Sequence, residues 1–158
     1  MSKFGKHTST KIIELGSCAF RQPNAAFNRS GAGENSKRCS FVHGYKLEAK
    51  FWFECKNLDD KNWCVDFGGL GELKKKLQHQ FDHTLTIDEQ DPLLPLFQQL
   101  HEQGGCDLRV MDGVGIEKVA EWCYKTANEF IKEVTNERCW VFKVEVWEHD
   151  KNSAMYTE

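Results

Sequence analysis

The stretch Cys39-Ser-Phe-Val-His43-Gly44-Tyr45 opens a long alternating segment, and this segment decides the fold. From His43 to Cys55, residues with apolar or aromatic character recur at every second position, whereas the intervening positions are mostly charged. Because successive side chains of a strand point to opposite faces, the pattern predicts a strand over residues 42–55 with one buried face. His43 and Tyr45 share that face. The sequence therefore places a thiol, an imidazole and a phenol at the mouth of a buried sheet face, where a small-molecule site is expected.

The elements around this strand predict an α+β domain. Apolar residues at helical spacing indicate two long helices, and alternation indicates further strands. A strand pair close in sequence, followed by helices, is typical of an antiparallel sheet with two helices on one face. The predicted elements, in chain order, are a strand over 10–20, a polar loop over 21–38, the strand over 42–55, a hairpin connection over 57–62, a returning strand over 63–67 that pairs with the second strand, a helix over 70–81, a short segment over 92–101, a strand or extended link over 108–111, a helix over 116–134 and a final strand over 140–148.

Length and composition favour one soluble domain over residues 1–158, with residues 1–9 as a flexible N-terminal tail. The net charge of −3 and the lack of a basic run argue against a nucleic-acid partner. No apolar stretch is long enough to cross a membrane, and the first residues lack the apolar core of a signal peptide. The seven cysteines contain no CxxC pair, so we expect reduced thiols in a cytoplasmic protein.

Two places in the sequence carry groups suited to proton transfer. Cys39 follows Lys37 and Arg38, and nearby cations favour a thiolate, although a cysteine is more often a small buried apolar residue. Asp82 and His83 stand where the first helix is predicted to end. A carboxylate can orient an imidazole and raise its basicity, although a histidine in a helix-terminal turn is also an ordinary structural feature.

Two glutamates could bind a ligand. Glu148 is the last residue of the alternating, otherwise apolar series in the final strand. It marks either the solvent-exposed end of the strand or a carboxylate that binds a pair of N–H donors of a ligand. Glu117 opens the second helix, where an acid interacts favourably with the helix dipole in any case. Neither residue is a specific signal by itself.

Taken together and in order, these features resemble the 6-pyruvoyl-tetrahydropterin synthase and 6-carboxy-tetrahydropterin synthase family, over roughly residues 10–156. The resemblance implies a tunnelling fold (T-fold), in which the sheets of several protomers form an oligomeric barrel with active sites at subunit interfaces. It also implies a homo-oligomer, a trimer or a hexamer of two trimers. The matching motifs are Cys39-x3-His43-Gly44, Val65-Asp66-Phe67 with Leu70, Asp82-His83, Glu117 and Val146-Trp147-Glu148.

The resemblance also implies a function and roles for the candidate residues. The family substrate is dihydroneopterin triphosphate, and the chemistry is elimination of triphosphate with rearrangement or cleavage of the side chain, for tetrahydrobiopterin or queuosine and deazapurine synthesis. Cys39 matches the cysteine that moves a proton on the substrate side chain, and Asp82 and His83 match the pair that assists it. Glu148 matches the carboxylate that holds the amino-pyrimidine edge of the pterin, and Glu117 matches the acid of the helix-opening motif.

The zinc ligands of the family are the main departure. Family members bind zinc through three histidines, and here the first position falls near Ala19-Phe20 and the last is Tyr45, so that only His43 remains. A catalytic zinc needs about three protein ligands, so the sequence implies either no metal cofactor or an incomplete zinc site. The segment 114–117 also lacks the family's threonine or serine.

Three hypotheses follow from these retained and lost residues. The first is a pterin-processing lyase with altered or absent metal use. The second is a non-catalytic, metal-free homologue that binds a pterin or purine. The third is an oligomeric scaffold without a ligand.

Overall fold

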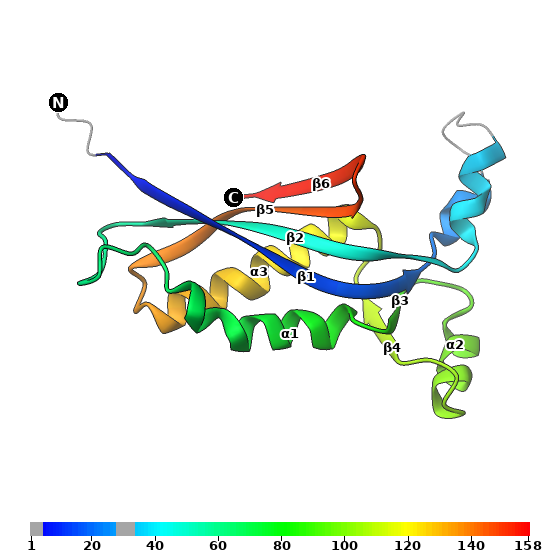
Figure 1. Ribbon diagram of the computed structural model, residues 1–158. Coiled ribbons are helices and arrows are strands. Elements are labelled where there is room, and N and C mark those ends of the chain that lie inside the picture. Colours follow the sequence, from blue (N-terminus) through cyan, green and yellow to red (C-terminus); the bar gives the residue numbers. More distant parts are fainter. Residues whose placement is uncertain (1–4, 28–33) are drawn as a thin grey trace.

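The computed structural model describes residues 5–27 and 34–158 and shows a long, twisted sheet with two helices along one face (Figure 1). The elements are β1 (His7–Phe20), the 3-10 helices η1 (Pro23–Phe27) and η2 (Glu34–Ser40), β2 (His43–Cys55), the 3-10 helix η3 (Phe67–Leu70), α1 (Gly71–Phe81), β3 (Thr84–Asp88), α2 (Leu94–Glu102), β4 (Leu108–Met111), α3 (Ile116–Val134), β5 (Cys139–His149) and β6 (Asn152–Thr157).

The six strands lie in the order β4-β3-β1-β2-β5-β6. β1, β2, β5 and β6 form antiparallel pairs, as the alternation of β2 predicted. β3 and β4 were not expected in this arrangement, because β3 pairs with β1 in parallel and β4 pairs with β3 in parallel. The sheet is therefore mixed at one edge, and the prediction of a wholly antiparallel sheet is corrected there. The helical connections α1 and α2 make the parallel pairs possible, since a parallel pair needs a crossover.

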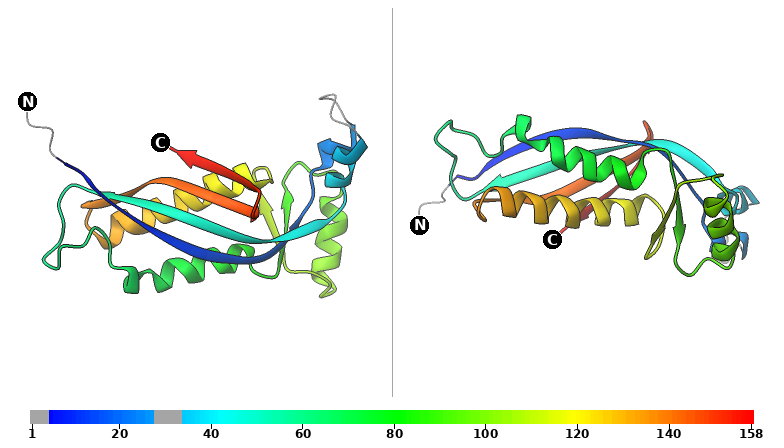
Figure 2. Two further views of the ribbon diagram at one scale, coloured as in Figure 1. Left: turned by 45° about the horizontal axis from the view of Figure 1, so that its top comes forward. Right: turned by 90° about the horizontal axis from the view of Figure 1, so that it is seen from below.

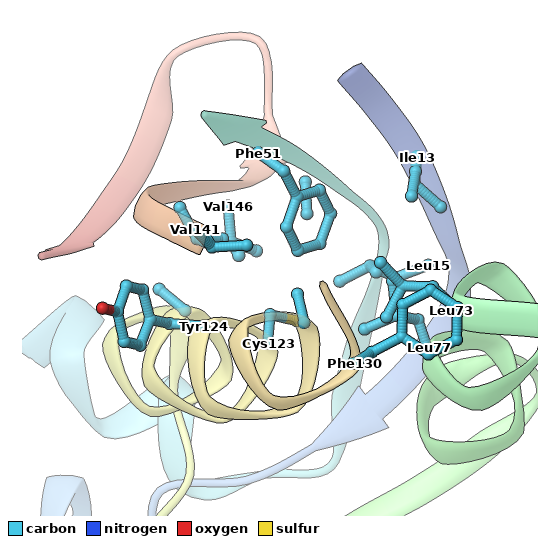
Figure 3. Close-up of a cluster of buried hydrophobic side chains, with 14 of the residues drawn as sticks. Ile13, Leu15, Phe51, Leu73, Leu77, Cys123, Tyr124, Phe130, Val141 and Val146 are labelled. Atoms are coloured by element: carbon cyan, nitrogen blue, oxygen red, sulfur yellow. The ribbon is translucent and has the colours of Figure 1, made fainter. Parts of the chain in front are cut away.

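The main core lies between the sheet and the two long helices (Figures 2 and 3). Every second residue of β2 from Leu47 to Cys55 is buried, which confirms the predicted buried face. α1 buries the leucine and phenylalanine stripe of its predicted helix, and α3 buries the apolar stripe expected for residues 116–134. A smaller cluster packs α2 against β3 and β4, through Leu85, Ile87 and Phe97.

The strand predicted over residues 63–67 is wrong. Residues 56–66 form turns and bends that lead into η3. Asp59 accepts hydrogen bonds from the backbone N–H groups of Lys61 and Trp63, at 2.8 and 2.9 Å, and Asp66 caps η3 by accepting from Gly68 N at 2.9 Å. Aspartates that bond to nearby backbone groups compete with a sheet ladder. In addition, β1 and β5 already pair with both edges of β2, which leaves no edge for a returning strand.

Other boundaries also differ from the expectations. β1 begins at His7, so residues 7–9 belong to the sheet rather than to the tail expected over residues 1–9, whereas residues 1–4 lie outside the described residues. The polar loop expected over 21–38 contains η1 and most of η2, and its residues 28–33 also lie outside the described part. β3 and β6 were not predicted. No helix in the described ranges is long and apolar enough to cross a membrane.

Candidate functional site

Three of the predicted site residues come together where β2 begins and β5 ends. Tyr45 follows the parity of buried Leu47, so its ring lies on the helix-bearing side of the sheet. Burial raises the pKa of Tyr45, and the proximity of Glu148 and Cys39 raises it further. The phenol therefore stays protonated, with the Glu148 carboxylate and Cys39 nearby. The structure thus groups the predicted catalytic cysteine, the predicted pterin-binding glutamate and the residue that replaces a zinc ligand.

The ring of Tyr45 belongs to a cluster of four rings. Phe20 pairs with His43 across β1 and β2, and their ring centroids lie 5.1 Å apart. The Tyr45 ring is 5.7 Å from that of His43 and 5.9 Å from that of Phe20. His149 completes the cluster on the other side, with its ring 5.9 Å from that of Tyr45. His149 was not predicted, although its place directly after Glu148 in an exposed strand end was a signal that could have been used.

This cluster does not fit a three-histidine zinc site. His43 is oriented as a ligand would be, because its Nδ1–H donates to the Phe41 carbonyl at 2.7 Å and leaves Nε2 free. The ring opposite it, that of Phe20, has no donor atom, and the protonated phenol of Tyr45 is a poor ligand. Over residues 5–27 and 34–158, no group of three or more His, Cys, Asp or Glu side chains is arranged to hold a metal ion.

Glu148 is held at the same end of the sheet with part of its carboxylate accessible. Its side chain is 18% exposed, and its Oε1 accepts a hydrogen bond from Asn152 Nδ2 at 2.9 Å. The His149 Nε2 atom lies 3.8 Å from the same oxygen. An ionised carboxylate has about four lone-pair positions. Glu148 can therefore still accept two N–H groups of a planar ligand.

Glu117 and the side chain of Gln22 both lie close to Gly115, at the start of α3. Gln22 follows β1, and its backbone N–H donates to the Cys39 carbonyl at 2.7 Å. Its side-chain amide donates to the Val114 carbonyl at 2.5 Å, just before α3. A Cβ atom built on Gly115 would lie 3.0 Å from that amide nitrogen and 3.5 Å from Glu117 Oε2, so the glutamate lies beside Gln22. The Cys39 segment and the start of α3 are thus joined by one glutamine, which sequence reasoning missed.

The Asp82–His83 pair forms as predicted, at the end of α1. The Nδ1–H of His83 donates to Asp82 Oδ1 at 2.9 Å, since an ionised carboxylate can only accept. Asp82 also accepts from Ser17 N at 3.2 Å, and this places the pair against a bulge in β1. Gly16 makes the contact possible, because its φ is +107° and any Cβ there would overlap the Asp82 carboxylate. The Asp82–His83 pair is therefore held by specific contacts and is not a frayed helix end.

The imidazole of His83 faces a cavity that also reaches Tyr45. Its side chain is 85% exposed and lines this cavity of about 520 Å³ together with Tyr45 and Lys46. Thr84 pairs with Cys18, and Cys18 pairs with Tyr45, so the pair lies two strands from Tyr45. At a strand spacing of about 4.8 Å, that separation is roughly 10 Å, and β5 with Glu148 lies about 5 Å further. Among the described residues, the Asp82–His83 pair thus lines the same cavity as Tyr45 but forms no hydrogen bond with Cys39, Tyr45 or Glu148 of the same protomer.

Solved structures with the same architecture define the class of fold. A structure described as an uncharacterized protein, WS1659, from Wolinella succinogenes superimposes with a TM-score of 0.75 at 18% identity, covering 98% of this chain and 99% of that one. The 6-pyruvoyl tetrahydropterin synthase of Caenorhabditis elegans superimposes with a TM-score of 0.60 at 17% identity, covering 100% and 99% of the two chains. The protein has the T-fold of such synthases, as the resemblance implied.

Sequence comparison then gives the family. The model of the 6-pyruvoyl tetrahydropterin synthase family matches residues 18–158, and the chain belongs to this family. The 6-carboxy-5,6,7,8-tetrahydropterin synthase of Aquifex aeolicus is 24% identical over 159 residues, covering 96% of each chain. The same enzyme of Rickettsia conorii is 29% identical over 59 residues, which cover 37% of this chain and 43% of that protein.

Proposed function

We propose that this protein is a pterin-processing lyase that acts on dihydroneopterin triphosphate or a related pterin without the three-histidine zinc site. The observation that carries the proposal is the gathering of Cys39, Tyr45 and Glu148 at one end of the sheet, together with the Asp82–His83 pair between α1 and β3. Membership of the family and the relatives named as 6-carboxy-5,6,7,8-tetrahydropterin synthases support the substrate class.

The proposal gives each of these residues a separate task. The Glu148 carboxylate binds the paired N–H donors of the pterin edge, in the way that a carboxylate binds an arginine fork. The ring cluster around Tyr45 offers an apolar surface beside this carboxylate, and aromatic rings stack on planar ligands. Cys39 exchanges a proton with the side chain of the bound pterin. His83, with its Nδ1–H fixed on Asp82, has Nε2 free to take up or return a proton.

The separation of the two proton-transfer groups favours a site shared between protomers. β1 pairs with β3 only over Cys18–Phe20, so the first part of β1 has one unpaired edge, and β6 forms the outer edge at the other side of the sheet. Unpaired strand edges are templates for pairing with another chain. We propose that these edges join in a homo-oligomeric barrel, which brings the His83 of one protomer to the Cys39 of the next.

Turnover is tested with dihydroneopterin triphosphate, with and without added zinc, by chromatography and mass spectrometry of the pterin products. We expect wild-type protein to convert the substrate and the Cys39→Ala variant to lose activity while still binding the pterin. Mixing Cys39→Ala with His83→Ala protein, after dissociation and reassembly, tests the shared site. If each site takes the two residues from different protomers, about a quarter of the sites in the mixture are intact. No turnover by wild type in either condition sinks the lyase proposal.

The ring cluster favours a second candidate, a non-catalytic homologue that binds a pterin or purine. Phe20 and Tyr45 are the rings that lie beside His43, where the resemblance implies two further zinc ligands, and neither ring supplies an imidazole nitrogen. For this candidate we expect pterin binding that depends on Glu148, without product formation. Calorimetric titration of wild type and the Glu148→Gln variant with dihydroneopterin measures it. Absence of binding by both proteins would instead favour a scaffold without a pterin ligand, and equal binding by both would contradict the role of Glu148.

A further inference from the structure

A buried ion pair links the end of β1 to the segment before α2, and it touches the chain beside Cys39. Arg21 donates through Nε to Asp91 Oδ2 at 2.7 Å and through Nη2 to Asp91 Oδ1 at 2.9 Å. The Asp91 side chain is 0% exposed and that of Arg21 is 14% exposed. The two residues are separated by 70 positions in the sequence. Paired, two-pronged contacts of this kind fix the guanidinium plane in one orientation.

The third nitrogen of this guanidinium holds the Cys39 segment. Arg21 Nη1 donates to the Ser40 carbonyl at 2.9 Å, and Gln22 N donates to the Cys39 carbonyl at 2.7 Å. Two consecutive carbonyls of η2 are therefore bound by two consecutive residues after β1. The Ser40 hydroxyl also donates to the Lys37 carbonyl at 2.6 Å, which closes the last turn of η2. The backbone at Cys39 is thus held from outside η2 as well as from within it.

Asp91 itself is fixed by its own segment. Its Oδ1 accepts from Leu93 N at 2.8 Å, and its backbone N–H donates to the Asp88 carbonyl at 2.9 Å, at the end of β3. Burial works against ionisation of Asp91, but the bonds from Arg21 and Leu93 outweigh it and hold its pKa below the ordinary value. The Asp91 carboxylate is therefore held in one position, and it fixes the orientation of the Arg21 guanidinium.

We propose that Arg21, oriented by Asp91, is a positioning residue that sets the place of Cys39 in the site. The catalytic part of this inference rests on the proposed lyase function, whereas the structural part does not. The contact of Nη1 with the Ser40 carbonyl ties the orientation of the guanidinium to the backbone directly after the predicted catalytic cysteine. A small displacement of a reacting group can lower a rate by about 100-fold, so this contact matters for turnover more than for substrate affinity.

The test removes the pair without leaving a buried charge. Arg21→Met combined with Asp91→Asn removes both charges, and the asparagine keeps an oxygen for Leu93 N. Arg21→Lys keeps the positive charge but cannot reach Asp91 and Ser40 at once. The control is Arg138→Met, because Arg138 holds another loop in the same manner, donating to the carbonyls of Asn57 at 2.7 Å and Cys64 at 2.9 Å.

Hydrogen exchange measured by mass spectrometry reports how firmly the Cys39 segment is held. In the double variant we expect exchange at least about 10-fold faster at the Gln22 amide and over residues 34–42, and wild-type exchange in β2 and α3. In Arg138→Met we expect faster exchange only over residues 57–64. Exchange over residues 34–42 at the wild-type rate in the double variant, or an equal increase throughout the protein, would overturn the proposal.

Kinetics on the pterin substrate then test the catalytic part. We expect kcat of the double variant to fall about 10- to 100-fold with KM changed less than about 3-fold, and Arg21→Lys to recover part of kcat. Faster exchange with wild-type kcat contradicts a positioning role. If wild type has no turnover, the lyase proposal fails while the exchange result still decides whether Arg21 holds the Cys39 segment.

Discussion

Introducing two histidines beside His43 should create a zinc site in this protein. With a Zn–N distance of about 2.05 Å and tetrahedral angles, three imidazoles on one zinc have ring centroids about 5.2 Å apart. The rings of Phe20, His43 and Tyr45 have centroid separations of 5.1, 5.7 and 5.9 Å. The backbone thus already holds three rings close to the required spacing. We therefore expect the Phe20→His/Tyr45→His variant to bind about one zinc per protomer, and wild type to bind less than about 0.1.

The energetic effect of the two changes can be estimated. Loss of apolar burial at Phe20 costs about 2 kcal/mol, because its side chain is almost fully buried. Zinc at 100 times its Kd stabilises the folded state by about 2.7 kcal/mol, which offsets the loss. For a domain of this size, 1 kcal/mol changes Tm by about 2–4 °C, so zinc should raise the Tm of the variant by about 5–10 °C. We expect no zinc-dependent change in the Tm of wild type.

The assay is metal analysis after dialysis against zinc, together with thermal unfolding with and without the metal. Phe20→Asn/Tyr45→Asn is the matched control, since it makes the same positions polar without supplying an imidazole. One zinc per protomer in wild type would refute the argument from the donor set. A folded Phe20→His/Tyr45→His variant that does not bind zinc would refute the argument from ring spacing.

Three further predictions concern other parts of the site. Gly16→Ala should destabilise the protein by about 2–4 kcal/mol in urea unfolding, because the strained φ and the overlap displace the Asp82 carboxylate; a loss below about 0.5 kcal/mol would contradict this contact. The pKa of Asp91 is lower in the folded than in the unfolded protein, so its charge stabilises the fold above the unfolded pKa of about 3.9. This stability is lost as the pH falls through the folded pKa. Asp91→Asn should therefore reduce the loss of stability at acid pH, measured by urea unfolding. At pH 8, exposed Cys39 should react with iodoacetamide well before Cys123, whose pKa is raised by complete burial, as mass spectrometry of the alkylated peptides will show.

The parts of the fold that follow a simple period could be predicted from the sequence. The alternation after Tyr45 gave β2 and its buried face, and the helical spacing of apolar residues gave α1 and α3. The same reasoning failed over residues 63–67, where the apolar residues looked like a strand but aspartate side chains bind the local backbone. It also missed β3, because five residues directly after a helix carry too short a pattern to be distinguished from a loop.

Contacts between distant residues could not be predicted in this way. Nothing in the sequence near Gly16 indicates that Asp82 lies against it, and the pairing of Arg21 with Asp91 depends on how β3 is placed beside β1. The resemblance to a family indicated the candidate catalytic and ligand-binding residues, but not the residues that hold them in position. Those supporting groups became visible only when the strand order and the crossover helices were known.

In the proposed site, pterin binding and pterin turnover would depend on different residues. Glu148 keeps an accessible carboxylate beside an aromatic surface, and neither feature depends on a metal. Recognition of a planar N–H edge is therefore retained under both the lyase and the binding proposals, and measuring affinity alone cannot distinguish them. Turnover depends instead on whether the proton-transfer groups of Cys39 and His83 suffice without a Lewis acid. Gln22 and Arg21 hold the backbone of the Cys39 segment, and Gly16 leaves room for the Asp82 carboxylate that binds His83. Turnover requires fixed positions for both proton-transfer groups, whereas binding of the pterin edge requires only Glu148, and on this ground we favour the lyase proposal.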